Sequence, residues 1–138
     1  MAQQPVGYSG TPLARKLGIG PGAVVAVLGE PPEYRSWLEP VPDGVVFSGD
    51  TTTRTDVTHL FVTRRAELDD LLGGLRHGMR SDASIWVSWP KKASRVPTDV
   101  TEDTVREVAL PLGLVDVKVC AVSEVWSALK LVIRKELR

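Results

Sequence analysis

The sequence contains one cysteine, and this scarcity limits the kinds of site that the chain can build. Cys120 has no second cysteine with which to form an internal disulfide, and one thiolate is too few for a structural zinc site. We therefore expect a reducing compartment and no metal site. Because Cys120 stands in an apolar stretch, we interpret it as a small buried residue.

The chain also lacks a net charge and a long hydrophobic run. Lys and Arg together number 17, as do Asp and Glu, so no overall positive field is available to hold a nucleic-acid backbone or an anionic membrane. No apolar stretch approaches the roughly 20 residues that cross a bilayer, and no signal-peptide pattern opens the sequence. These absences predict a soluble, cytoplasmic protein that uses neither a membrane nor a nucleic acid as partner.

What the sequence does contain is an alternation of strand and helix patterns over the length of one ordinary domain. Residues 1–10 are polar and are interpreted as a flexible arm, which leaves 11–138 as a single domain. Apolar runs predict strands at 23–28, 45–48, 57–62, 84–89, 115–122 and 128–134. Periodicity and capping residues predict helices at 12–17, 31–38, 64–79 and 101–113.

This order of elements is typical of a doubly wound, three-layer α/β fold of Rossmann-like type. The last two strands are separated by a short turn and predict an antiparallel hairpin, which resembles the closing element of class I methyltransferases. Numbering the strands along the chain, we expect the order 2-1-3-4-6-5, mostly parallel, with strand 6 antiparallel. A flavodoxin-like, all-parallel sheet is the alternative, and the hairpin argues against it.

Several segments resemble an actinobacterial family known as domain of unknown function 3052 (DUF3052). The most specific is the run Trp-Pro-Lys-Lys within 86–94, and the other similar segments are 8–14, 59–64, 99–103 and 129–135. The resemblance spans nearly the whole chain. The resemblance implies that the chain is a member of this family, and it assigns no catalytic or binding residue.

The turn after the first strand is where Rossmann and methyltransferase folds place glycines, so that the backbone can approach a cofactor. Here Gly29 stands at the first glycine position, but Pro31 and Glu33 replace the other two. Proline offers no N–H group, and a glutamate repels a carboxylate or a phosphate. Asp50, after the second strand, suits a ribose contact. Without the glycines, however, we expect no bound cofactor and interpret the turn as vestigial.

Ligands of open α/β sheets bind at the carboxyl ends of the strands, where the strand order reverses. This edge is predicted to carry seven candidate ligand-binding residues for an anion or a partner, with Trp89 as an apolar or stacking wall. The candidates are Gly29, Glu30, Arg64, Arg65, Trp89, Lys91 and Lys92. The alternative is that the charges are merely solvated at loop tips and helix starts.

Catalytic residues are not indicated. His59 lies inside an apolar strand and is interpreted as a hydrogen-bonded core residue, and His77 as a charge at a helix end. The serines show no nucleophile-elbow pattern. The acidic residues Asp99, Glu102 and Asp103 fit helix capping better than a metal site.

The sequence leaves three functional hypotheses. The first is a non-catalytic binding or regulatory module, the second a small S-adenosylmethionine-dependent methyltransferase with an atypical cofactor turn, and the third a nucleotide or anion sensor. Only the short helix near 34–38 is expected on the second sheet face, which leaves strands 4, 5 and 6 uncovered there. This predicts a homodimer, with a monomer covered by residues 1–10 as the alternative. An unknown protein or a small anion remains a further expected partner.

Overall fold

A computed structural model describes residues 10–138, so all but the last residue of the predicted arm lies outside the described residues. The strands are β1 (Val24–Leu28), β2 (Val46–Ser48), β3 (Val57–Phe61), β4 (Ser84–Pro90), β5 (Leu114–Ala121) and β6 (Trp126–Ile133). The α-helices are α1 (Leu13–Lys16), α2 (Tyr34–Trp37), α3 (Arg65–Gly78) and α4 (Glu102–Ala109). Short 3₁₀ turns are η1 (Lys92–Ser94), η2 (Leu110–Leu112) and η3 (Lys135–Leu137).

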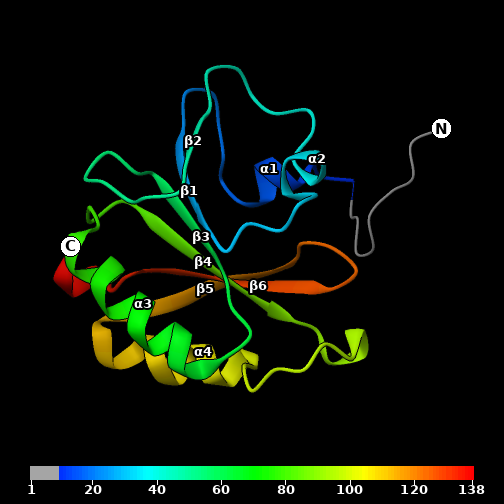
Figure 1. Ribbon diagram of the computed structural model, residues 1–138. Coiled ribbons are helices and arrows are strands. Elements are labelled where there is room, and N and C mark those ends of the chain that lie inside the picture. The colour runs from blue at the N-terminus through cyan, green and yellow to red at the C-terminus, as the bar shows by residue number, and fades with distance from the viewer. Residues whose placement is uncertain (1–9) are drawn as a thin grey trace.

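The strands form one sheet in the order β2-β1-β3-β4-β6-β5 (Figure 1). The pairs among β1 to β4 are parallel, whereas β6 runs antiparallel to both β4 and β5. The α/β class, the strand order and the antiparallel hairpin predicted from the sequence are thus confirmed. The all-parallel alternative is wrong, because β6 returns directly from β5 through a tight turn.

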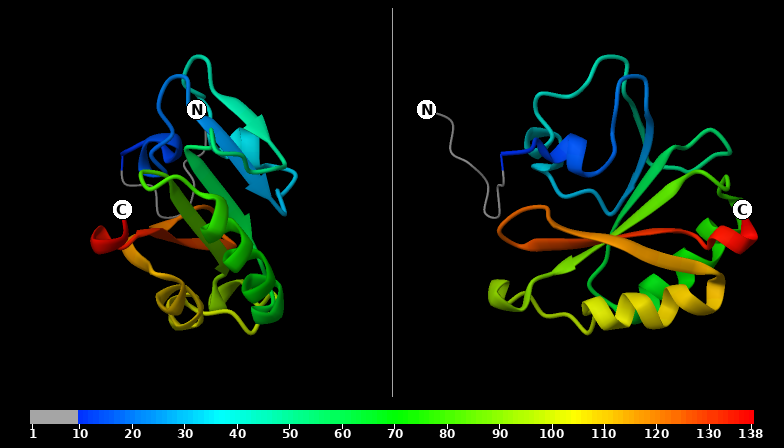
Figure 2. Two further views of the ribbon diagram at one scale, coloured as in Figure 1. Left: turned by 90° about the vertical axis from the view of Figure 1, so that its left-hand side faces the viewer. Right: turned by 180° about the vertical axis from the view of Figure 1, so that it is seen from behind.

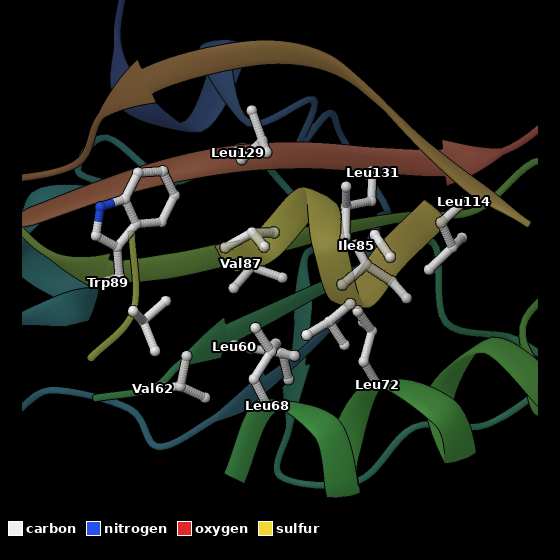
Figure 3. Close-up of a cluster of buried hydrophobic side chains, with 14 of the residues drawn as sticks. Leu60, Val62, Leu68, Leu72, Ile85, Val87, Trp89, Leu114, Leu129 and Leu131 are labelled. Atoms are coloured by element: carbon white, nitrogen blue, oxygen red, sulfur yellow. The ribbon is translucent and has the colours of Figure 1, made fainter. Parts of the chain in front are cut away.

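Helices α3 and α4 pack on one face of the sheet, as the periodic leucines predict (Figure 1). Leu68 and Leu72 are the fully buried side chains of α3, and they meet strand residues such as Leu60 and Ile85 (Figure 3). The cluster is almost wholly aliphatic. At up to about 3 kcal/mol for each large side chain removed from water, it supplies much of the driving force for folding.

The first turns of both helices are capped by side chains from the segment 99–104. Thr101 accepts a hydrogen bond from the Thr104 backbone N–H, and Thr104 Oγ1 accepts one from the Thr101 backbone N–H, which makes a reciprocal cap for α4. Asp99 Oδ1 accepts from the Arg65 backbone N–H at 2.7 Å. Asp99 therefore caps α3 from the loop after β4. Pro111 and Gly113 end the predicted helix 101–113 early, so η2 follows α4.

The opposite face carries α1 as well as α2, and this corrects the expectation that only the helix near 34–38 would cover it (Figure 2). The indole Nε1–H of Trp86, from the middle of β4, donates to the Leu17 carbonyl oxygen at 2.9 Å. Leu17 and Trp86 are both fully buried. The segment after α1 thus covers part of the face that the sequence argument left open.

The homodimer stays a prediction. The uncovered face of strands β4 to β6 on which it was based is smaller than expected, because the α1 segment covers part of it. Strand β5 remains at the edge of the sheet, with Val117 and Val119 more than half exposed. Among the described residues, no helix is long and apolar enough to cross a membrane.

Candidate functional site

Gly29 ends β1 with a backbone conformation that only glycine adopts easily. Its φ is +75°, and a Cβ placed on it would lie 2.6 Å from the carbonyl oxygen of Phe61, at the end of β3. The glycine is therefore explained by the close approach of two neighbouring strands. A cofactor is not needed to account for it.

The residues after Gly29 offer little to a negatively charged or carboxylate-bearing cofactor. Pro31 and Pro32 have no N–H, and the Tyr34 N–H already donates to the Pro31 carbonyl. The Glu30 carboxylate pairs with Arg35 at 3.2 Å, and the Arg35 guanidinium lies 4.0 Å from the centre of the Phe47 ring. The following helix, α2, has only four residues and so presents no extended helix dipole. These residues do not fit the cradle of S-adenosylmethionine or of a dinucleotide.

Arg64 and Arg65 stand at the start of α3, and only one of them is engaged. The Arg65 guanidinium donates to Glu107 of α4 at 2.7 Å and lies 3.9 Å from Asp69. Arg64 is exposed and, within residues 10–138, takes part in no ion pair. Thus Arg65 joins the two helices, whereas the Arg64 charge remains available to an outside anion.

The turn that holds these arginines is tied to the loop after β4. Thr98 Oγ1 donates to the Thr63 carbonyl oxygen at 2.6 Å, and the Asp99 N–H donates to the same oxygen at 3.3 Å. The sequence suggested that neighbouring loops meet at this edge, and these contacts show two of them joined. The contacts are made by Thr98 and Asp99, at the carboxyl-terminal end of the 91–99 loop.

Lys91 and Lys92 begin that loop, but they lie on another part of it. The Lys91 N–H donates to the Val125 carbonyl in the β5–β6 turn, and Lys92 opens η1. In Figures 1 and 2, η1 stands to one side of the first turns of α3 and α4. In the part of the chain that the structure describes, neither lysine forms an ion pair. The four predicted cations are therefore spread along the edge, with Arg65 already neutralised.

The prediction that Trp89 forms a stacking wall for a ligand is corrected by the position of its side chain. Its side chain is only 8% exposed and packs with the aliphatic residues under α3 and α4 (Figure 3). The ring is part of the core because β4 is buried along its whole length. The hypothesis missed this because the proline and lysines that follow Trp89 in the sequence marked it as a loop neighbour.

A buried chain of polar side chains crosses the sheet beneath α2. The Tyr34 hydroxyl lies 2.9 Å from His59 Nδ1, and His59 Nε2 lies 2.6 Å from Ser88 Oγ. All three residues are fully buried. Burial lowers the pKa of His59 to about 3, and burial, aided by the Glu30 charge, raises the pKa of Tyr34 above its ordinary value. The interpretation of His59 as a hydrogen-bonded core residue is confirmed, whereas its partners could not be read from the sequence.

Solved structures with the same architecture are methyltransferases and related proteins. A putative type 11 methyltransferase from Sulfolobus solfataricus superposes with a TM-score of 0.62 at 11% identity, with 89% of this chain and 90% of that chain covered. LepI in complex with SAM gives 0.54 at 14%, with 88% and 39% covered, and the Bacillus subtilis M1A22 tRNA methyltransferase TrmK gives 0.53 at 10%, with 83% and 62% covered. The chain therefore has a methyltransferase-like α/β fold, and identities this low establish the fold alone.

The family is established separately, from the sequence. Residues 14–135 match the model of the family described as protein of unknown function, DUF3052, and the chain belongs to this family. The resemblance noted in the Trp-Pro-Lys-Lys run is thereby confirmed. A search of curated proteins found no match to the chain.

Proposed function

We propose that this protein is a non-catalytic binding or regulatory module built on a methyltransferase-like core. The observation that carries the proposal is the turn after β1. There Gly29 is required by Phe61, two prolines remove N–H donors, and Glu30 is paired with Arg35. The buried histidine, His59, is enclosed beneath α2 and is not available to deprotonate a substrate at this edge.

The proposal is tested by titration calorimetry with S-adenosylmethionine, S-adenosylhomocysteine and a nucleotide panel. We expect no saturable heat with the first two ligands at millimolar concentration. The variant Pro31→Gly/Glu33→Gly, which restores both glycines of the cofactor pattern, sharpens the result. Weak binding that appears only in this variant would identify the turn as the cause. Saturable binding of S-adenosylmethionine by the unaltered chain would overturn the proposal in favour of a small methyltransferase.

An anion sensor is the second candidate, and the free charges at the carboxyl edge favour it. Arg64, Lys91 and Lys92 make no ion pair among residues 10–138, and cations beside the start of α3 oppose its dipole. Heat with nucleotides that is lost in Lys91→Gln/Lys92→Gln, and no heat with S-adenosylmethionine, would support this interpretation.

A further inference from the structure

A groove of about 640 Å³ lies between the α1 segment and the carboxyl-terminal half of strand β5. Thr11, Arg15 and Lys16 line one side, and Lys118 and Cys120 line the other. Both views in Figure 2 show α1 beside the β5–β6 hairpin, on the face opposite α3 and α4. The residues lining the groove include three cations and no carboxylate, although the whole chain has no net charge.

A fourth cation, Lys130, stands next to the groove. Lys130 of β6 is paired directly with Lys118 of β5 in the antiparallel register, so both side chains leave the same face of the sheet. Its Nζ reaches to 4.0 Å from where a Cβ on Gly18 would stand, just after α1. We call Arg15, Lys16, Lys118, Lys130 and the space between them the basic groove.

The Lys118–Lys130 pair cannot be explained by stability. Like charges directly opposite each other on neighbouring strands destabilise a sheet. Neither lysine forms an ion pair within residues 10–138, so no described carboxylate relieves the repulsion. Arg106 is a contrasting case, because its guanidinium meets three carboxylates. Lys118 and Lys130 thus bring two positive charges together that form no ion pair within the described residues.

The charges also lie close to one another. Lys16 of α1 and Lys118 of β5 both act on the Cys120 thiol, lowering its pKa against the larger effect of burial, which raises it. Lys16 and Lys118, from two different elements, therefore both lie near the Cys120 thiol, which also lines the groove. An anion bound in the groove could therefore be contacted by a cation from α1 and by one from β5.

We propose that the basic groove binds a small molecule with at least two phosphate charges, of about the size of a nucleoside diphosphate. Lysine and arginine side chains are the usual donors to phosphate oxygens. The volume falls within the range of small-molecule pockets, roughly 300–1,000 Å³. A small ligand is favoured over a nucleic acid because the neutral chain carries no extended positive field.

The test is calorimetry at low salt with three probes: inorganic pyrophosphate, ADP and adenosine. We expect saturable binding of pyrophosphate and ADP, and none of adenosine. In Lys118→Gln/Lys130→Gln the affinity should fall about tenfold or more, as for the loss of charge-assisted hydrogen bonds. The matched control is Arg54→Gln/Lys135→Gln, which removes two exposed cations that belong neither to the basic groove nor to the carboxyl edge, and which should change affinity less than twofold.

Lys118→Gln/Lys130→Gln should also melt at a higher temperature than the unaltered protein, because the repulsion between the two lysines across β5 and β6 is removed. Weaker ligand binding together with a raised melting temperature would show that the two lysines serve a ligand and do not stabilise the fold. The proposal is overturned if neither pyrophosphate nor ADP binds saturably, or if adenosine alone binds. It is also overturned if Lys91→Gln/Lys92→Gln, which removes two cations from the carboxyl edge, loses affinity and Lys118→Gln/Lys130→Gln does not. None of these outcomes depends on S-adenosylmethionine, so this test and that of the proposed function fail independently.

Discussion

The two faces of the sheet are built in different ways. Under α3 and α4 the core is aliphatic except for Trp89, and two helices of ordinary length supply it. On the other face, which we call the aromatic face, two four-residue helices cover aliphatic residues together with the rings of His59, Phe61 and Trp86. Tyr34 of α2 packs among these rings. The His59 and Phe61 rings stack with centroids 4.3 Å apart, and Tyr34 meets both edge-on.

This contrast shows how each face is specified. Aliphatic side chains pack without directional contacts, so the α3–α4 face depends mainly on pattern and volume. Four-residue helices have no stability of their own, and those on the aromatic face must be held by tertiary contacts. The bonds that hold them join residues far apart, namely Trp86 to Leu17, and Tyr34 to His59 to Ser88.

The largest expected effect is on the aliphatic face. Leu72→Ala should lower the free energy of unfolding by about 3–4 kcal/mol, because a fully buried side chain of α3 is removed and a cavity is left. Urea unfolding measures the change. Val46→Thr, at a half-exposed position on the edge strand β2, is the control and should stay within about 0.5 kcal/mol. Equal losses in the two variants would contradict the assignment of this face as the main core.

The difference between the faces also explains what the sequence could predict. The strand positions and the α3 helix follow from apolar runs and leucine spacing, which are local patterns. The strand order followed from the resemblance of the terminal hairpin to that of class I methyltransferases, and the structure confirms it. The covering of Trp86 by Leu17 depends on residues 69 apart in the chain, and no local pattern signals it. At the candidate site, sequence reasoning found the loops at the carboxyl edge. It could not show that Arg65 is neutralised by Glu107 or that the Trp89 ring turns inward.

A pH titration tests the polar chain on the aromatic face. In the unfolded chain His59 takes up a proton near pH 6.5, whereas in the folded protein its pKa is about 3. Between these values the unfolded state binds more protons, so the stability is fully present above pH 6.5 and falls as the pH is lowered. From pH 7 to pH 5 the contribution of His59 amounts to about 2 kcal/mol.

The control for this titration is His59→Gln, which keeps polar atoms at the position but does not titrate. Denaturant unfolding at pH 7, 6 and 5 should show the loss in the unaltered protein and a nearly flat profile in the variant. The pKa of Asp56 is lowered by the hydrogen bond from the Val24 N–H and then by Arg80, and the pKa of Asp82 is lowered by Arg80, so the effects of both groups fall at more acid pH. An unchanged slope in His59→Gln would mean that another group carries the pH dependence.

The smallest effect compares the two tryptophans of β4, one on each face. Trp86→Phe keeps an aromatic ring but removes the donor to the Leu17 carbonyl, at a cost of about 1–2 kcal/mol. Trp89→Phe is the matched control, because Trp89 makes no side-chain hydrogen bond among the described residues and loses only packing. Hydrogen exchange distinguishes the two. The amides of Leu17 and Ile19, bonded to the carbonyls of Leu13 and Ala14, should lose protection in Trp86→Phe beyond the change in global stability, and should keep it in Trp89→Phe. If both variants left these amides equally protected, α1 would be held by apolar packing alone, and the two faces would differ in composition without differing in how they are fixed.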